Sequence, residues 1–489
     1  MLLVVSLDSE SQNWLDEQLD SGALPNLSHL ARIGTRVPVA SVALAGVAYP
    51  TLYSGLRPAQ HGLHFPVEWS PNEQRVCPWS HAATTPSVFE RADGAGARVV
   101  VLDPPECPPQ HLTHGFAASG IQFRSRVLLP SWSSAPARHA LLSSLVKSAP
   151  RADEVFGRPS ERDLASLQRA LLGGPARLAA ASLEFLRADP PDCLWVTCCG
   201  MHVAAHQFFD LGLLPDSDAR RQLETTRLAV ARGYDAMLGD VLSALPAGSD
   251  VVVFYAKGMD HTNGWVDLLP AMLSSVLGGT REAAEPVSRL RQLVPRSLRS
   301  RVATLLSDDM ALSVMARLST PRADWSRTRA FVLPSDGPGF IRFNLSGRER
   351  HGIVPEAERR ALTDEIRAGL ASFTDLDGEP CVQSVREPEE LYGMGTHITR
   401  FPDLLVFWNQ KPTLRGGGVR SPKFGEFRRV GVSTGRSGNH ASGSFALLVP
   451  GRSQVTSSAI IQPEDIPATL LSALGLPHND LPGQSRLRR

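Results

Sequence analysis

The chain begins with MLLVVSLDSES (residues 1–11), in which the nearly continuous apolar run of residues 2–7 ends at the acidic residue Asp8. A short apolar run rich in β-branched residues is typical of a strand that is buried on both faces of a mostly parallel sheet. The same pattern recurs along the chain at residues 98–102, 193–198, 250–255, 404–408 and 445–449. We therefore predict that residues 2–7 form the first strand of such a sheet.

Segments with helical spacing separate these strands. Apolar residues recur at intervals of three and four over residues 164–187 and 223–245, after Pro355, and over residues 464–474. Strands that alternate with helices predict an α/β class fold, an α/β/α sandwich around a large mixed, mainly parallel sheet, in a single domain over residues 1–489. Residues 104–160 and 280–325 lack clean periodicity, so we interpret them as insertions that form either a cap or ordinary surface connections.

The composition excludes several classes of function. Lys plus Arg number 50 and Asp plus Glu 49, so the net charge of +1 argues against a protein that coats nucleic acid or an anionic membrane. Aromatic residues make up only 6% of the chain, and no platform for stacking bases is visible. No apolar run reaches the roughly 18 residues that a membrane span needs, and the first residues lack the basic region of a secretory signal.

The cysteines and the overall residue usage bear on where the protein works. The 6 cysteines match no zinc or redox spacing, which favours buried thiols in a reducing compartment. We therefore expect a cytoplasmic protein. A high content of Ala, Arg, Pro and Gly suggests a bacterial source with GC-rich DNA.

Polar side chains follow several of the predicted strands at the point where each strand ends. In open α/β sheets, functional sites gather at the carboxyl ends of the strands. Each residue alone has an ordinary explanation, such as a turn aspartate or a polar loop, but three histidines and two carboxylates at one sheet edge favour a metal site. The candidates are Asp8, His202, His206, Lys257, Asp260, His261 and His440.

The order of segments resembles the alkaline phosphatase superfamily, and in particular its type I phosphodiesterase and nucleotide pyrophosphatase branch. The similarity begins with VVSLDSES (4–11) and continues with GALPNLSHLARIG (22–34) and SGLRPAQHGL (54–63). Later landmarks follow in the same order as in the family. They are GFIRFNLSGRERHGIV (339–354), FPDLLVFW (401–408), GNHASGSFALLVPG (438–451) and EDIPATLLSALGLP (464–477).

This resemblance implies two divalent metals, commonly zinc, around a nucleophilic side chain that lies nine residues before the position of Ser54. That position is Ala45, which has no hydroxyl group. A covalent intermediate on this residue is therefore excluded, and any hydrolysis would proceed by direct attack of water.

The metal ligands that the resemblance implies are only partly retained. The family's Asp and His, four residues apart, fall on His202 and His206, and its late loop histidine falls on His440. These three residues would form a His₃ site with an open position, which suits catalytic zinc. The Asp-His pair of the second metal falls on Ala256 and Lys257, so only Asp8 remains of that site.

Lys257 places a positive charge where a divalent cation binds in the family. Its ammonium group could neutralise Asp8 and hold an anionic oxygen, or it could only form a salt bridge that preserves the fold. A third interpretation is that Asp260 and His261 rebuild a site in a shifted register.

Three functions follow as hypotheses. The first is a diverged hydrolase or group-transfer enzyme with one zinc, in which metal-bound water attacks a phosphodiester, an ester or an amide, with Lys257 and Asp8 as catalytic residues. The second is a pseudoenzyme that binds a ligand or a partner protein, for example within a biosynthetic pathway. The third is an ordinary two-metal phosphodiesterase. For the enzyme, the partner would be a small-molecule or peptide substrate, with no nucleic acid and no membrane.

Overall fold

The computed structural model describes residues 1–78, 85–135, 139–279, 308–321, 323–432 and 434–489. The chain divides into two compact units. The first comprises Met1–His61, Ala82–His261 and Gly435–Arg489, and the second comprises Gly62–His81 and Thr262–Thr434. Each unit has its own sheets and its own hydrophobic core.

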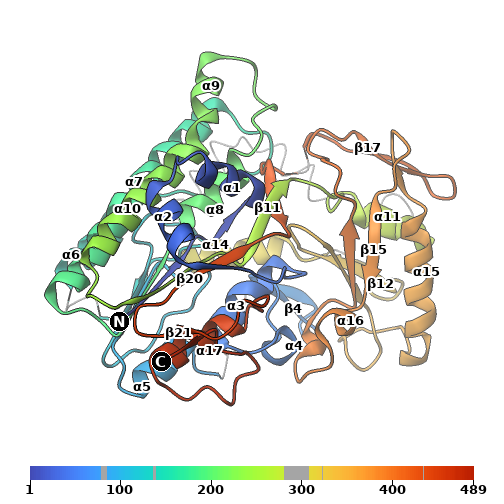
Figure 1. The fold of residues 1–489 in the computed structure, drawn as a ribbon. Helices are drawn as coiled ribbons and strands as arrows, with labels where there is room; N and C mark the ends of the chain where they lie inside the picture. The colour runs from blue at the N-terminus through green and yellow to red at the C-terminus, as the bar shows by residue number, and fades with distance from the viewer. Residues whose placement is uncertain (79–84, 136–138, 280–307, 322, 433) are drawn as a thin grey trace. The chain divides into compact units, whose positions relative to one another are not determined.

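An eight-stranded mixed sheet forms the centre of the first unit, with the strand order β3-β20-β10-β1-β9-β6-β7-β8 (Figure 1). The strands β10, β1, β9, β6 and β7 run parallel, whereas β20 is antiparallel to β10, β3 to β20, and β8 to β7. The strands are β1 (Leu2–Ser6), β3 (Thr35–Pro38), β6 (Val99–Leu102), β7 (Phe116–Ser119), β8 (Trp132–Ser133), β9 (Cys193–Thr197), β10 (Asp250–Phe254) and β20 (Phe445–Val449).

Helices cover both faces of this sheet because its central strands are apolar on both sides. In β1, Leu3 and Val5 belong to one core cluster, whereas Leu2 and Val4 belong to another on the opposite face. The first cluster includes residues of α1 (Gln12–Asp20), α2 (Pro25–Ile33), α6 (Ala140–Ser148), α7 (Glu161–Ala188), α8 (Cys199–Gln207) and α10 (Thr226–Ala244). The second includes residues of α3 (Ala48–Ser54), α5 (Val88–Gly94) and α17 (Asp465–Ala473).

A second, three-stranded sheet stands next to the carboxyl edge of the main one. It has the order β19-β11-β2, with β2 (Ser9–Glu10), β11 (Lys257–His261) and β19 (Gly438–Ala441). The strands β2 and β11 closely follow the parallel strands β1 and β10, and β19 closely precedes the antiparallel strand β20. All three therefore lie at the same edge of the main sheet. The remaining elements of this unit are η1 (Ala45–Val47), α4 (Pro58–His61), α9 (Asp218–Glu224), β21 (Gln454–Val455) and β22 (Leu487–Arg488).

The second unit is built around the antiparallel sheet β12-β13-β16-β15. Leu269 and Met272 of α11 and Leu362 and Ile366 of α15 belong to the same core cluster as residues of this sheet. The strands of the sheet are β12 (Ala330–Leu333), β13 (Gly339–Phe343), β15 (Val382–Arg386) and β16 (Leu404–Trp408). The other elements are β4 (Val67–Ser70), β5 (Arg75–Pro78), α11 (Leu269–Val276), α14 (Asp308–Leu318), η4 (Glu356–Glu358), α15 (Arg359–Ala371), β14 (Thr374–Asp375), α16 (Pro388–Tyr392), η5 (Ile398–Arg400), β17 (Gly418–Ser421) and β18 (Gly425–Arg428).

The predicted fold class is confirmed: helices flank a large mixed, mainly parallel sheet. All six predicted strands form, although the segment at residues 404–408 joins the sheet of the second unit. Residues 104–160 supply β7, β8 and α6, and of residues 280–325 the stretch 280–307 lies outside the described residues. The single domain and the cap therefore stay predictions. Among the residues that the structure describes, no helix is both long enough and apolar enough to cross a membrane.

A buried carboxylate of α10 caps the amino end of α2. The residue before α2 is Leu24, which has no side chain that could accept a hydrogen bond from the free N–H groups of the first turn. Asp235 accepts these bonds instead, from the backbone N–H of Asn26 at 3.2 Å and from that of Leu27 at 2.8 Å. The side-chain amide of Asn26 also donates to Asp235, at 3.0 Å.

We expect Asp235→Ala to lower the midpoint of thermal unfolding by about 4 °C, which corresponds to roughly 2 kcal/mol of lost capping and hydrogen bonding. The measurement is a thermal melt followed by circular dichroism. Asp240→Ala removes an exposed carboxylate from the same helix and should leave the midpoint within about 1 °C. Equal midpoints for the two variants would contradict the assigned cap.

Candidate metal centre

Three neighbouring strands of the main sheet deliver the candidate residues to one place. In the strand order β10-β1-β9, β10 is followed by Lys257, β1 by Asp8, and β9 by the helix α8 with His202 and His206. These strands are parallel, so their carboxyl ends meet at one edge of the sheet. His440 reaches the same edge on β19, which pairs with β11 so that His440 lies opposite Met259.

The three histidines form a compact cluster. His202 and His206 lie one helical turn apart on α8, and His440 faces them from β19. The ring centroids of His202 and His206 are 4.7 Å apart, those of His202 and His440 5.0 Å, and those of His206 and His440 4.7 Å. One ring nitrogen from each histidine lies within 4.8 Å of the other two, so the cluster could bind a metal ion.

In each of the three rings one nitrogen has a hydrogen-bond partner, and in two of the rings the other nitrogen is buried without one. His202 Nδ1 lies 3.0 Å from Asp8 Oδ1, and His206 Nδ1 lies 2.8 Å from the carbonyl oxygen of Gly438. His440 bonds to the backbone of Gly258. Among the described residues, His206 Nε2 and His440 Nδ1 are buried atoms without a partner. Metal-binding histidines show this pattern, because a carboxylate or carbonyl holds one ring nitrogen and leaves the other for the metal.

Asp8 is the centre of the polar contacts behind the histidines. Its side chain is fully buried, and its φ of 65° places a non-glycine residue in the left-handed region, a strained conformation of the kind found at functional sites. Besides His202, its Oδ1 atom accepts a hydrogen bond from the Tyr49 hydroxyl and one of 3.3 Å from Ser9 Oγ. The ammonium nitrogen of Lys257 lies 3.7 Å from the same oxygen.

The charges around Asp8 keep it ionised. Burial alone would raise the pKa of Asp8, but attraction to His202 and Lys257 and hydrogen bonds from His202 and Ser9 outweigh this effect and lower the pKa below its usual value. Lys257 is itself only 3% exposed, and its ammonium nitrogen also lies 3.9 Å from the centroid of the Tyr49 ring. Asp8 and Lys257 therefore form a buried ion pair against an aromatic face.

Two of the histidines are held in the neutral form that binds metal. Burial lowers the pKa of His206 well below its usual value, and the positive charge of Arg436 lowers it further. Burial, followed by the charge of Lys257, lowers the pKa of His440 in the same way. Both rings therefore keep a free lone pair at neutral pH.

Sequence reasoning missed two residues of this centre. Tyr49 lies in α3, four residues after Ala45, and its hydroxyl donates a hydrogen bond to Asp8. Its spacing in the sequence does not indicate this role. Arg436 lies in the loop before β19, where it pairs with Glu154 at 2.5 Å and acts on the charges of His206 and His440. The Gly- and Ser-rich composition around it indicated only a loop.

Four other predicted positions have different surroundings. Asp260 and His261 lie exposed at the far end of β11, where the His261 ring packs on Phe209 with centroids 4.9 Å apart. Among the described residues, they do not belong to the group that could hold a metal. Ala45 begins η1 directly before α3, and Ala256 is a buried apolar residue between β10 and β11. Neither alanine can ligate a metal or act as a nucleophile.

Two solved structures are similar to this chain in fold. Phosphonoacetate hydrolase from Sinorhizobium meliloti 1021 matches with a TM-score of 0.52 and 13% identity over 97% of this chain and 95% of that one. The alkaline phosphatase PafA matches with a TM-score of 0.54 and 13% identity over 99% of this chain and 98% of that one. At this identity the two structures establish the fold alone.

The family assignment comes from the sequence model of the type I phosphodiesterase/nucleotide pyrophosphatase family, which matches residues 2–414. The chain belongs to this family, as the resemblance predicted. No curated protein matches the sequence.

We expect Asp8→Asn to weaken zinc binding by about 10- to 100-fold, because the variant keeps the size of the side chain but loses the charge that orients His202. Competition with a zinc-binding dye of known affinity measures the change. Asp260→Asn removes an exposed carboxylate from β11 and should bind zinc like the parent. If the parent binds two ions and Asp8→Asn only one, Asp8 is itself a metal ligand, contrary to this assignment.

Proposed function

We propose that the protein is a diverged hydrolase of phosphodiesters or related esters that uses a single metal ion held by His202, His206 and His440. The observation that carries the proposal is the convergence of three ring nitrogens whose opposite nitrogens are already bonded to Asp8, Gly438 and Gly258. A set of three imidazoles with an open position suits zinc. When bound, zinc supplies Lewis acidity and lowers the pKa of water to about 7.

In this proposal, the positive charge of Lys257 replaces that of the second metal ion. Its ammonium group lies beside Asp8 and close enough to His440 to affect its charge, so it stands at the same edge as the cluster. A fixed cation there stabilises negative charge that develops on the substrate oxygen in the transition state. Asp8 holds Lys257 on one side and His202 on the other, so it positions both groups without touching the substrate.

The absence of a nucleophilic side chain defines the reaction as direct hydrolysis. Ala45 has no hydroxyl group, and the first hydroxyl in the following helix, that of Tyr49, donates a hydrogen bond to Asp8. Water is then the attacking group, and no covalent intermediate with the protein forms. An amide would be cleaved by the same arrangement, because its carbonyl develops the same negative charge.

Residues 45 and 256 are alanines where the resemblance implies a nucleophile and a metal ligand. This loss of functional groups favours a second candidate, a pseudoenzyme that binds a ligand or partner protein. The two candidates differ in what the histidine cluster does. A pseudoenzyme needs neither a filled metal site nor Lys257, whereas the hydrolase needs both.

The hydrolase proposal is tested with bis(4-nitrophenyl) phosphate and 4-nitrophenyl acetate as probes, with zinc added to the metal-free protein in stepwise amounts. We expect hydrolysis to rise with zinc and to level off at a single equivalent. His440→Ala should lose zinc and activity together, whereas His29→Ala, which changes an exposed histidine of α2, should keep both. Zinc uptake without hydrolysis of either probe, or activity equal in His440→Ala, would contradict the proposal.

We expect Lys257→Met to lower kcat on the order of 100-fold while zinc binding stays within about threefold, because the variant keeps the volume but loses the cation. Lys257→Arg keeps the charge and should recover part of the rate. Steady-state kinetics and zinc titration on the same preparations separate the two effects. A Lys257→Met variant that keeps full kcat would show that Lys257 serves the fold alone.

A further inference from the structure

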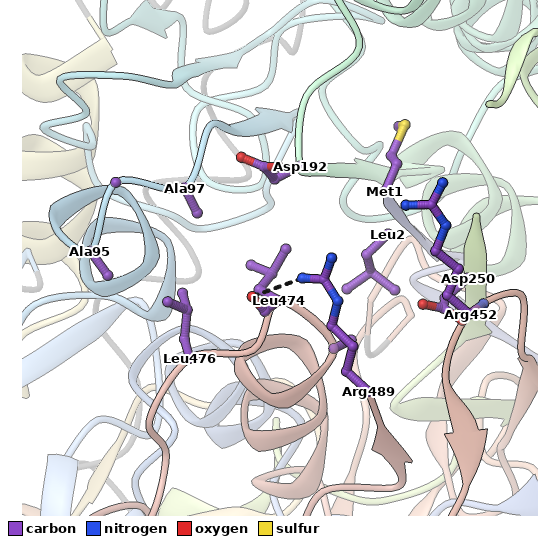
Figure 2. A pocket seen from close by; sticks show the side chains of 12 residues that line it. Met1, Leu2, Ala95, Ala97, Asp192, Asp250, Arg452, Leu474, Leu476 and Arg489 are labelled. Carbon is purple, nitrogen blue, oxygen red and sulfur yellow. Dashed lines mark hydrogen bonds between the residues drawn. The ribbon is translucent and has the colours of Figure 1, made fainter. Parts of the chain in front are cut away.

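A pocket of about 390 Å³ in the first unit has no role in the chemistry described above. We call it the aromatic pocket; its main walls are Trp14, Phe208, Phe209, Leu211, Arg227 and Leu228. Its volume lies within the range of small-molecule sites. A second cavity of about 220 Å³ contains Asp192, Asp250 and Arg452 at the opposite edge of the main sheet (Figure 2). The carboxylate of Asp250 there is already bonded to the backbone of residues 451–453, so it is not free for a ligand.

The aromatic pocket continues two elements of the metal centre, the helix α8 with two of the clustered histidines and the strand β11 with Lys257. On α8 and just beyond it, His202, His206 and Phe209 follow one another at helical spacing, and Phe209 is a pocket wall. On β11, Lys257 and His261 lie on one face of the strand, and His261 also lines the pocket. Gly438 contacts both the histidine cluster and the pocket. Its carbonyl oxygen accepts a hydrogen bond from His206, and a Cβ atom added to it would lie 2.9 Å from the side chain of Phe209.

The charged groups of the pocket are largely engaged with one another. Arg227 pairs with the buried Glu10 at 2.5 Å, and its guanidinium carbon lies 4.6 Å from the Trp14 ring centroid and 4.5 Å from that of Phe209. Glu224 pairs with Arg220 at 2.9 Å, and Asp210 accepts from the backbone of Gly212 at 2.7 Å. The carboxylates of Glu10, Glu224 and Asp210 therefore already have partners, which argues against an organic cation as the ligand.

One polar atom of the pocket lacks a partner. Arg227 is nine-tenths buried, and its Nε–H group has no acceptor among the described residues. The same Nε atom has almost no accessible surface, so a molecule in the pocket does not reach it. The aromatic and leucine side chains of the walls therefore decide what the pocket binds, and they favour a flat apolar group.

We propose that the aromatic pocket binds an aromatic substituent of the substrate. The substrate class is then an aryl- or arylalkyl-substituted phosphoester or related ester. This inference rests on the proposed function, because it assumes that the reacting group of the same molecule lies at the histidine cluster.

The probes are three phosphonates that cannot be hydrolysed as esters: methylphosphonate, benzylphosphonate and 4-hydroxybenzylphosphonate. Calorimetric titration of the zinc-loaded protein should show benzylphosphonate binding about tenfold more tightly than methylphosphonate, because the ring is removed from water. The 4-hydroxy compound should bind no more tightly than benzylphosphonate, because its hydroxyl group finds no accessible donor at Arg227 Nε.

The pocket itself is tested by filling it. Leu228→Trp places a large side chain from α10 into the pocket and should remove the preference for the aromatic probes, leaving methylphosphonate unchanged. Arg232→Trp adds the same side chain at an exposed position of α10 and should bind like the parent. Should Leu228→Trp disturb the fold, Leu228→Ala, which enlarges the pocket, is expected to favour 1-naphthylmethylphosphonate over benzylphosphonate.

The outcomes separate this inference from the proposed function. The inference about the pocket is overturned if Leu228→Trp still prefers the aromatic probes and Leu228→Ala has the same size selectivity as the parent. This holds even if zinc-dependent hydrolysis is found. Aromatic preference that depends on Leu228 in both zinc-loaded and metal-free protein supports the pocket, even if hydrolysis fails. Equal binding of all the phosphonates to the parent protein overturns the pocket directly.

Discussion

The buried carboxylate of Asp8 is the interaction on which the rest of the centre depends. A charge removed from water must be paired and hydrogen-bonded, and here His202, Lys257, Tyr49 and Ser9 meet that need at Oδ1, whereas Oδ2 has no hydrogen-bond partner among the described residues. Each partner is thereby held in place: His202 in its ring orientation, Lys257 in an apolar environment, and Tyr49 over the lysine. Because all of these contacts converge on one oxygen, the loss of the Asp8 charge would loosen the metal cluster and the cation at the same time.

The topology of the sheet explains why residues far apart in the chain form one centre. The adjacent strands β10, β1 and β9 run parallel and end at the same edge, where Lys257, Asp8 and α8 follow them. The strand β20 runs in the opposite direction, so the residues before it, including His440, reach that edge as well. In the proposed hydrolase, Lys257 stands at this edge where the resemblance predicts a metal ligand.

The sequence predicted the buried strands and most of the cluster, because the strands are apolar on both faces and the polar residues follow them at the carboxyl ends. Residues 404–408 show the limit: their pattern identifies a buried strand but not which sheet it joins. Tyr49 could not be predicted, since its role arises from where α3 packs and not from a local pattern. The hydrogen bonds from His206 to Gly438 and from His440 to Gly258 could not be predicted for a similar reason, because they use backbone carbonyls that every residue possesses.

The central claim is that the buried pair of Asp8 and Lys257 occupies the place of a second metal, leaving one ion on the histidines. Crystals of the zinc-loaded protein, measured at the zinc absorption edge, test this directly. The account predicts one anomalous peak at about 2.0–2.1 Å from a ring nitrogen of His202, His206 and His440. A second peak beside Asp8, with Lys257 displaced, or a single peak bound to Asp8 in place of the histidines, would contradict it.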